Sequence, residues 1–222
     1  MKKYRYILFD LDGTLVYSHP GIYACFRYAL EKMGIGEEPC EEVLQKCVGP
    51  SLEYSFATFF GMTEEDAKRA TAFYRERYAV KGVFENTPIP GALDCLKGLK
   101  EAGYILALAT SKPKIFADKI AERFGFSEYL KVQIGPGMDG SLPTKTDVII
   151  EAMRQLNAKS EECLMVGDRE YDVDGARKAG VDCVGLLLGY AEQGEFARCN
   201  PAFVVKDFEE LTALLSKNLH KQ

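Results

Sequence analysis

Two short apolar runs in this chain end in pairs of acidic residues. The run Tyr6–Phe9 leads into Asp10 and Asp12, and the run "CLMVG" leads into Asp168, with Asp172 four residues later. Four carboxylates in one crevice repel one another strongly, so such a cluster requires cations. Ligands that are all oxygen suit magnesium. The spacing therefore predicts a Mg²⁺ site at the ends of two strands.

Hydroxyl and ammonium groups occupy two further positions of the same kind. Thr110 and Ser111 end the apolar run "YILALA", and Lys145 begins the helix expected after the third strand. Ligands of open parallel sheets bind beyond the carboxyl ends of the strands, near the point where the strand order reverses. A metal, a lysine, hydroxyl groups and N–H groups at helix starts can together bind phosphate. Carboxylates that form an aspartyl-phosphate are established nucleophiles, so the pattern indicates phosphoryl transfer.

The apolar periodicity divides the chain into a helical segment and an alternating segment. Residues 17–87 show helical patterns only, whereas strands and helices alternate from residue 88 onward. Alternation of this kind predicts a parallel sheet. We expect one α/β domain, residues 1–16 and 88–222, interrupted after its first strand by a helical insert, residues 17–87. The expected strands are 4–9, 104–111, 129–135, 163–168 and 181–189. The expected helices are 20–33, 49–61 (a turn followed by a helix), 63–78, 88–103, 113–125, 144–156, 171–180 and 208–219.

Composition excludes several classes of protein. The chain has 222 residues, a net charge of −5 and no basic cluster, so we expect neither nucleic acid nor a membrane surface as a partner. No apolar run approaches the length of a membrane span, and seven cysteines without a CxxC pair favour reduced thiols in the cytoplasm. The only histidines, His19 and His220, are expected at the surface, which argues against zinc and against histidine-based catalysis.

Four motifs together resemble the haloacid dehalogenase-like superfamily. "FDLDGTLV" is similar to its first motif, hhhDxDGTL, and "LALATS" to its second, an apolar strand that ends in Thr or Ser. Lys145 matches the lysine of the third motif, and "MVGDREYDVDGARKAG" resembles the fourth, GDxxxDxxGAxxAG. The resemblance implies a Rossmann-like, doubly wound core with an α-helical cap inserted after the first strand. It also implies a Mg²⁺-dependent phosphatase that acts on a small phosphorylated metabolite.

The resemblance assigns chemical roles to the acidic residues. Asp10 is implied as the nucleophile that attacks phosphorus. Asp12 is implied as the general acid and base, which protonates the leaving oxygen and then activates water. Asp10, the backbone carbonyl of Asp12 and Asp168 are implied as magnesium ligands, with Asp172 bound less directly or through water.

The resemblance also implies a set of phosphate ligands. Thr110, the N–H group of Ser111 and Lys145 would bind the phosphate. Gly13 would let the backbone turn tightly over it, and the Thr14 hydroxyl would brace that turn.

Some details favour one branch of the superfamily. Arg169 stands where Thr or Ser is frequent, and Thr146 stands where Pro is frequent. With "GPSLEYSF" and "ATSKP", these residues resemble the branch of 5′-nucleotidases and phosphoglycolate phosphatase-like enzymes. In that comparison Ser51 and Tyr54, at the "GPS" turn of the insert, are candidates for substrate specificity.

Nearby charged residues have simpler interpretations. Lys112 and Lys114 are expected to be solvated, and Asp174 is expected to be an acidic residue in the first turn of a helix, where the helix dipole favours it.

Several alternatives stay open at the level of sequence. A sugar-phosphate mutase would use the same core, and a phosphonate hydrolase would need an imine-forming lysine, for which the insert offers Lys32, Lys46, Lys68 and Lys81. A haloalkanoate dehalogenase would lack the second aspartate, so Asp12 argues against it. A non-catalytic binding module would lack the nucleophile or the lysine, and both are present. The sequence leaves open which phosphate ester is the substrate and whether the protein is a monomer or a homodimer.

Overall fold

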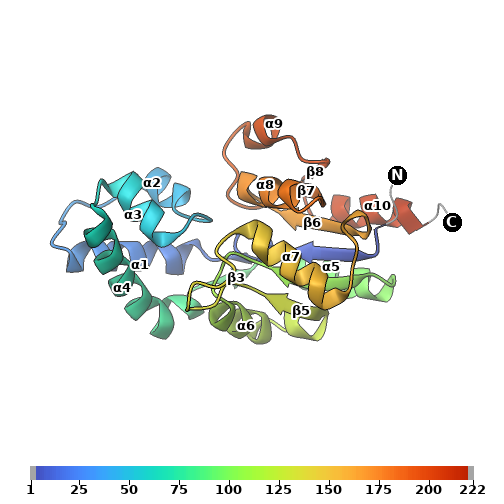
Figure 1. Cartoon of the computed structure of the whole chain (residues 1–222), viewed down its shortest axis with the longest axis horizontal. Helices are drawn as coiled ribbons and strands as arrows, with labels where there is room; N and C mark the ends of the chain where they lie inside the picture. The colour runs from blue at the N-terminus through green and yellow to red at the C-terminus, as the bar shows by residue number, and fades with distance from the viewer. Residues whose placement is uncertain (1–3, 220–222) are drawn as a thin grey trace. The chain divides into compact units, whose positions relative to one another are not determined.

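The chain forms two compact units in the computed structural model, which describes residues 4–219 (Figure 1). The core unit consists of Met1–Val16 and Pro88–Gln222, and the inserted unit consists of Tyr17–Thr87. The chain passes between the units at two short strands, β2 (Val16–Tyr17) and β3 (Thr87–Pro88), which pair as a two-stranded sheet. None of the described helices combines the length and the apolar character that crossing a bilayer requires.

The core unit contains a six-stranded sheet in the order β5-β4-β1-β6-β7-β8, in which every strand pair is parallel. Its strands are β1 (Tyr6–Phe9), β4 (Ile105–Ala109), β5 (Leu130–Ile134), β6 (Cys163–Gly167), β7 (Asp182–Leu186) and β8 (Phe203–Val205). The sequence predicted the first five of these, and β8 was missed. The expected α/β fold with a doubly wound parallel sheet is confirmed.

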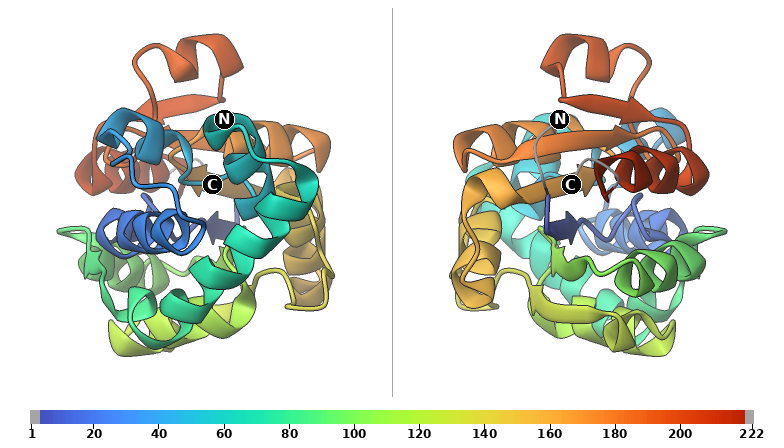
Figure 2. Two further views of the ribbon diagram at one scale, coloured as in Figure 1. Left: turned by 90° about the vertical axis from the view of Figure 1, so that its left-hand side faces the viewer. Right: turned by 90° about the vertical axis from the view of Figure 1, so that its right-hand side faces the viewer.

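Helices cover both faces of this sheet. They are α5 (Ala92–Glu101), α6 (Lys114–Arg123), α7 (Lys145–Leu156), α8 (Glu170–Lys178), α9 (Glu195–Cys199) and α10 (Phe208–Leu219), with short 3₁₀ turns at Phe126–Glu128 and Ser160–Glu162. Helices α7 and α8 pack on one face, and α5 and α10 lie together on the other (Figure 2). Ile7, Leu8 and Phe9 are fully buried because a parallel strand is covered from both sides, which explains the continuous apolar run.

The inserted unit is helical. It contains α1 (His19–Lys32), α2 (Glu41–Lys46), α3 (Leu52–Phe60), α4 (Glu64–Val80) and a 3₁₀ turn at Gly82–Phe84. Phe26 forms the centre of its aromatic core, with ring centroids 4.9 Å from Phe56 and 5.1 Å from Tyr74. The Thr63 hydroxyl caps α4 by accepting a hydrogen bond from the Asp66 N–H.

The order of the strands determines which loops lie together. After β1 the chain builds β4 and β5 on one side, and it then crosses to β6, β7 and β8 on the other side of β1. The carboxyl ends of β4, β1 and β6 are therefore neighbours at the point where the order reverses. Thr110, Asp10 and Asp168 directly follow these three strands.

Candidate active site

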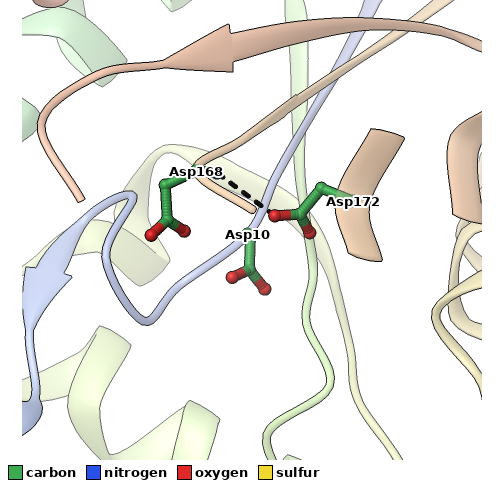
Figure 3. Close-up of side chains that lie close together, drawn as sticks. All are labelled: Asp10, Asp168 and Asp172. Atoms are coloured by element: carbon green, nitrogen blue, oxygen red, sulfur yellow. Dashed lines mark hydrogen bonds between the residues drawn. The ribbon is translucent and has the colours of Figure 1, made fainter. Parts of the chain in front are cut away.

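Three carboxylates lie together at this edge of the core sheet. Asp10 follows β1, Asp168 follows β6, and Asp172 belongs to the first turn of α8 (Figure 3). One oxygen of each lies within 4.8 Å of the others, and all three residues are buried. The structure thus brings together three of the four aspartates that the sequence singled out.

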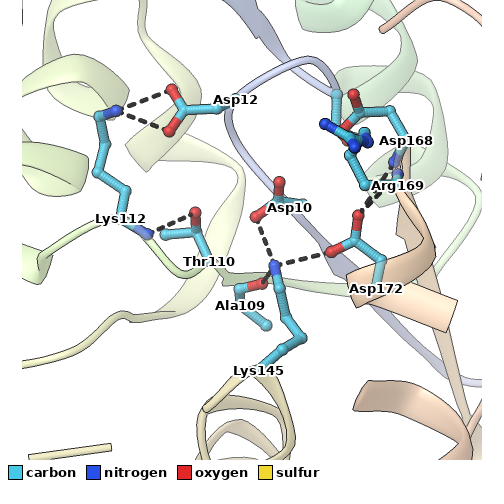
Figure 4. Close-up of polar contacts among 10 residues, drawn as sticks. Asp10, Asp12, Ala109, Thr110, Lys112, Lys145, Asp168, Arg169 and Asp172 are labelled. Carbon is cyan, nitrogen blue, oxygen red and sulfur yellow. Dashed lines mark hydrogen bonds and ion pairs between the residues drawn. The ribbon is translucent and has the colours of Figure 1, made fainter. Parts of the chain in front are cut away.

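Lys145 supplies the positive charge beside this group. The Thr144 hydroxyl caps α7 and places Lys145 at the first helical position. The Lys145 Nζ atom donates to Asp10 Oδ1 at 2.6 Å and to the Ala109 carbonyl at 3.1 Å, and it lies 2.8 Å from Asp172 Oδ1 (Figure 4). One ammonium group therefore joins the end of β4, the end of β1 and the start of α8.

Burial and like charge perturb these groups. Burial, with repulsion from Asp172, raises the pKa of Asp10 to about 6, although the Lys145 ammonium opposes the rise. The pKa of the Asp168 carboxyl is raised well above its ordinary value, first by burial and then by Asp172 and Asp10. Burial lowers the pKa of Lys145, but the two carboxylates it contacts outweigh that effect and raise it. The site favours a bound cation, because a cation would relieve this repulsion.

The Asp168 carboxylate is held from two sides. Its Oδ1 accepts a hydrogen bond from the Thr14 hydroxyl at 3.2 Å, and its Oδ2 accepts one from the Tyr190 N–H at 2.7 Å. Glycines leave room for it, since a Cβ atom on either Gly13 or Gly189 would lie 2.1 Å from Asp168 Oδ2. Gly13 also has φ +81°, a conformation that side chains rarely adopt. Thr14 follows this glycine, and its expected role of bracing the turn stays a prediction.

Asp172 has a second function in the local fold. Its Oδ2 accepts hydrogen bonds from the N–H groups of Asp168 and Arg169, each at 3.1 Å. These bonds satisfy free N–H groups at the start of α8, where the helix dipole also favours a carboxylate. Asp174, two residues later, is exposed and pairs with Arg177 at 2.5 Å, as expected of a helix-surface residue.

Asp12 lies apart from the three clustered carboxylates and forms an ion pair of its own. Both of its carboxylate oxygens accept hydrogen bonds from Lys112 Nζ, at 2.8 and 2.6 Å (Figure 4). The lysine side chain is only 5% exposed. The expectation that Lys112 is solvated was therefore wrong. An ammonium group can be buried here because Asp12 neutralises its charge. Lys114 is exposed and pairs with Asp118, in agreement with its expected position.

The two hydroxyl residues after β4 have different environments. Thr110 is buried, and its Oγ1 accepts a hydrogen bond from the Lys112 N–H at 3.2 Å. Ser111 is exposed. Both belong to the turn between β4 and α6, which leads directly to Lys112.

The remaining candidate residues belong to the inserted unit. Ser51 is the N-cap of α3, where its hydroxyl accepts a hydrogen bond from the Tyr54 N–H at 3.4 Å, and the Tyr54 side chain is 53% exposed. Their suggested contact with substrate stays a prediction. His19 is half-buried at the start of α1, and His220 lies outside the described residues.

Comparison with known proteins gives the family. The family model for haloacid dehalogenase-like hydrolases matches residues 7–186, which include every core-unit site residue that the sequence predicted. The chain belongs to the haloacid dehalogenase-like hydrolase family. This hydrolase is 36% identical to a 5′-nucleotidase of Pseudomonas aeruginosa over 216 residues, which is 97% of both chains.

Two further relatives carry different names. A crystal structure of a protein from Clostridium acetobutylicum, described as a predicted phosphatase, matches this hydrolase with a TM-score of 0.91 and 40% identity, over 96% of this chain and 99% of that one. The tyrosine-protein kinase PtkA of Mycobacterium tuberculosis is 38% identical over 184 residues, which is 83% of this chain and 62% of PtkA.

Sequence reasoning missed a buried ion pair beside the site of this hydrolase. Arg169 Nε donates to Glu195 Oε1 at 3.0 Å, and both side chains are nearly inaccessible. Arg169 was noted only as a departure from the usual motif. Its unusual residue type directly after Asp168 was a signal, but no local pattern indicates a partner 26 residues away.

Proposed function

We propose that this hydrolase is a Mg²⁺-dependent phosphomonoester phosphatase that transfers a phosphoryl group first to Asp10 and then to water. The observation that carries the proposal is the contact between Lys145 and Asp10, with Asp168 and Asp172 beside them. In this arrangement a carboxylate that we assign as the nucleophile lies next to an ammonium group and to two carboxylates that we assign to the metal site. A phosphoryl transfer site needs these groups, because its catalysis depends mainly on positioning and on neutralising charge.

The donor set supports a divalent cation. The core-unit site has four carboxylates, of Asp10, Asp12, Asp168 and Asp172, and three of them contact the ammonium groups of Lys112 and Lys145, which supply only two positive charges.

Oxygen ligands suit magnesium, and repulsion from neighbouring carboxylates adds to the burial that raises the pKa values of Asp10 and Asp168. Asp10, the Asp12 carbonyl and Asp168 would hold the ion, with Asp172 bound less directly. A bound Mg²⁺ would keep Asp10 ionised and neutralise charge on the phosphoryl oxygens.

In the first step a carboxylate oxygen of Asp10 attacks phosphorus, and the bond from phosphorus to the ester oxygen breaks. The leaving oxygen keeps the bonding electron pair and takes a proton from Asp12, so an alcohol departs. Lys145 and the Thr110 hydroxyl stabilise the negative charge of the non-bridging oxygens, together with the Ser111 N–H. The product of this step is an aspartyl-phosphate.

In the second step a water molecule attacks the phosphorus of the aspartyl-phosphate. Asp12 takes the proton of that water, and the bond between Asp10 and phosphorus breaks to release inorganic phosphate. Both oxygens of Asp12 accept hydrogen bonds from Lys112, a contact that would hold the carboxylate in place for this step.

We propose nucleoside 5′-monophosphates and phosphoglycolate as the first substrates to test. The relative called 5′-nucleotidase is 36% identical, and one called phosphoglycolate phosphatase 1, also from Pseudomonas aeruginosa, is 29% identical. Residues 17–87 would act as the cap that distinguishes leaving groups, with Ser51 and Tyr54 as its contacts. A cytoplasmic location stays a prediction.

The test is a substrate panel with the natural protein and two variants. Nucleoside monophosphates, phosphoglycolate and sugar phosphates are assayed for released phosphate with Mg²⁺. Asp10→Asn should abolish turnover because it removes the nucleophilic charge and keeps the shape. Asp174→Asn, on the exposed surface of α8, should leave turnover unchanged.

Turnover near the natural rate in Asp10→Asn would contradict the covalent mechanism. Phosphate passed to a sugar, without release into solution, would indicate a mutase instead.

A further inference from the structure

The Asp168 carboxylate depends on a loop that follows β7. The Tyr190 N–H donates to Asp168 Oδ2 at 2.7 Å, and Gly189 lies so close that a Cβ atom there would overlap the carboxylate. A backbone N–H group can orient a side chain only if its own segment is fixed. Some interaction must therefore fix the loop between β7 and α9.

The Glu195 carboxylate provides that interaction. Its Oε2 accepts a hydrogen bond from the Glu192 N–H at 2.8 Å, within the loop. Its Oε1 accepts from the Glu170 N–H at 2.6 Å, at the start of α8. A single carboxylate thus joins the loop to the helix that also carries Asp172.

Arg169 completes the arrangement. Its Nε atom donates to Glu195 Oε1, and both side chains are buried, with exposed fractions of 8% and 2%. A buried carboxylate without a cation would be costly, and the Arg169 guanidinium supplies a cation next to Glu195. The guanidinium charge also lowers the pKa of Asp168, against the larger effects of burial and of the neighbouring aspartates.

We propose that Arg169 and Glu195 are positioning residues for the metal site. They fix residues 188–194 against the start of α8, so that the Tyr190 N–H holds the Asp168 carboxylate in the orientation that binds Mg²⁺. This inference rests on the proposed magnesium site. It predicts that the ion pair affects metal affinity without touching the metal.

The experiment measures Mg²⁺ binding by isothermal titration calorimetry and thermal unfolding in chelator. Arg169→Met and Glu195→Gln should each raise the Kd for Mg²⁺ at least tenfold, while kcat at saturating Mg²⁺ stays within about threefold of the natural enzyme. The matched control is Arg154→Met, which breaks an exposed ion pair with Glu151 on α7 and should leave the Kd unchanged. A purely structural ion pair would lower the melting temperature in chelator and leave the Kd of the folded protein as it was.

A second variant tests the same contact without altering any charge. Gly189→Ala places a methyl group against Asp168 and should also raise the Kd at least tenfold. Gly98→Ala is its control, because a Cβ atom on Gly98 in α5 would meet nothing within 4 Å.

The outcomes separate the two proposals. If the natural protein binds no Mg²⁺, the proposed metal site is wrong. If the natural protein binds Mg²⁺ and Gly189→Ala binds it equally well, the positioning role is overturned, whether or not the ion-pair variants fold. Unchanged Kd values in folded Arg169→Met and Glu195→Gln would overturn it as well.

Discussion

Asp10→Asn should change how the stability of the metal-free protein depends on pH. Burial raises the pKa of Asp10 from 3.8 to about 6 in the folded protein. Between these two values the folded state binds a proton that the unfolded state releases. Rising pH therefore favours unfolding. The contribution of Asp10 to stability is fully present below about pH 4 and is lost as the pH rises past about 6.

The magnitude follows from the shift. Each pKa unit corresponds to about 1.4 kcal/mol, so the rise to about 6 amounts to about 3 kcal/mol for Asp10 alone. Asparagine at position 10 does not titrate, so the variant does not lose this stability as the pH rises. Relief of the repulsion that raises the pKa of Asp168 acts in the same direction. In chelator, the free energy of unfolding of Asp10→Asn minus that of the natural protein should increase by about 3 kcal/mol from pH 4 to pH 7.

Urea denaturation followed by circular dichroism at a series of pH values gives this difference directly. Taking the difference cancels the titration of groups that the two proteins share. Asp174→Asn should show no such trend, because its side chain is exposed and paired with Arg177. A difference that stays constant from pH 4 to pH 7 would refute the claim that the folded protein holds a proton on Asp10. Saturating Mg²⁺ should reduce the difference, because the ion binds the ionised carboxylate of the natural protein.

Three further predictions concern the metal, the second lysine and the inserted unit. Phosphatase activity should vanish in excess chelator and return with Mg²⁺. Ca²⁺ should inhibit the activity, because its coordination bonds are longer and its geometry is less regular. Full activity in chelator would contradict the proposed metal. Lys112→Met should lower the free energy of unfolding, measured by urea denaturation, by about 3 kcal/mol, because it leaves Asp12 without its cation. Lys114→Met breaks an exposed pair and should lower the free energy of unfolding by less than about 1 kcal/mol. Equal losses in the two variants would disprove the claim that burial makes the Lys112 pair more costly to break. The double variant Ser51→Ala, Tyr54→Ala should lower kcat/KM at least tenfold for the best natural substrate and much less for a small aryl phosphate. An equal loss for both substrates would contradict this, because loss of the N-cap of α3 alone would affect them alike.

The sequence predicted most of the core sheet and the edge that carries the site. Strands such as Tyr6–Phe9 and Cys163–Gly167 are buried on both faces, and their uninterrupted apolar character is a local property. The acidic residues that follow them are equally local. Parallel strands place their carboxyl ends at one edge, so Asp10 and Asp168 could be predicted to lie together without a structure.

Elements with little local signal escaped prediction. Strand β8 has three residues, of which only Val205 is buried, and it forms by pairing with β7. Helix α9 spans five residues after Gly194, which is too short for a periodic pattern.

The parts of the site that the sequence did not predict depend on contacts between residues far apart in the chain. Lys112 is buried because of Asp12, 100 residues away in the chain, and Arg169 is buried because of Glu195. A local reading of either basic residue favours solvent, since the partner that makes burial possible is supplied only by the fold.

The position of the insert within the core also affects how the chain can fold during synthesis. Strand β1 lies in the middle of the sheet, where Ile7 pairs with Leu106 on one side and with Leu164 on the other. The inserted unit is a continuous segment and can form its own contacts soon after leaving the ribosome. The amino-terminal strand must instead wait for β4 and β6, and closing such long loops raises the contact order of the core and slows its folding. The apolar strand β1 is therefore synthesised first but gains its two neighbours only after β4 and β6 have been made.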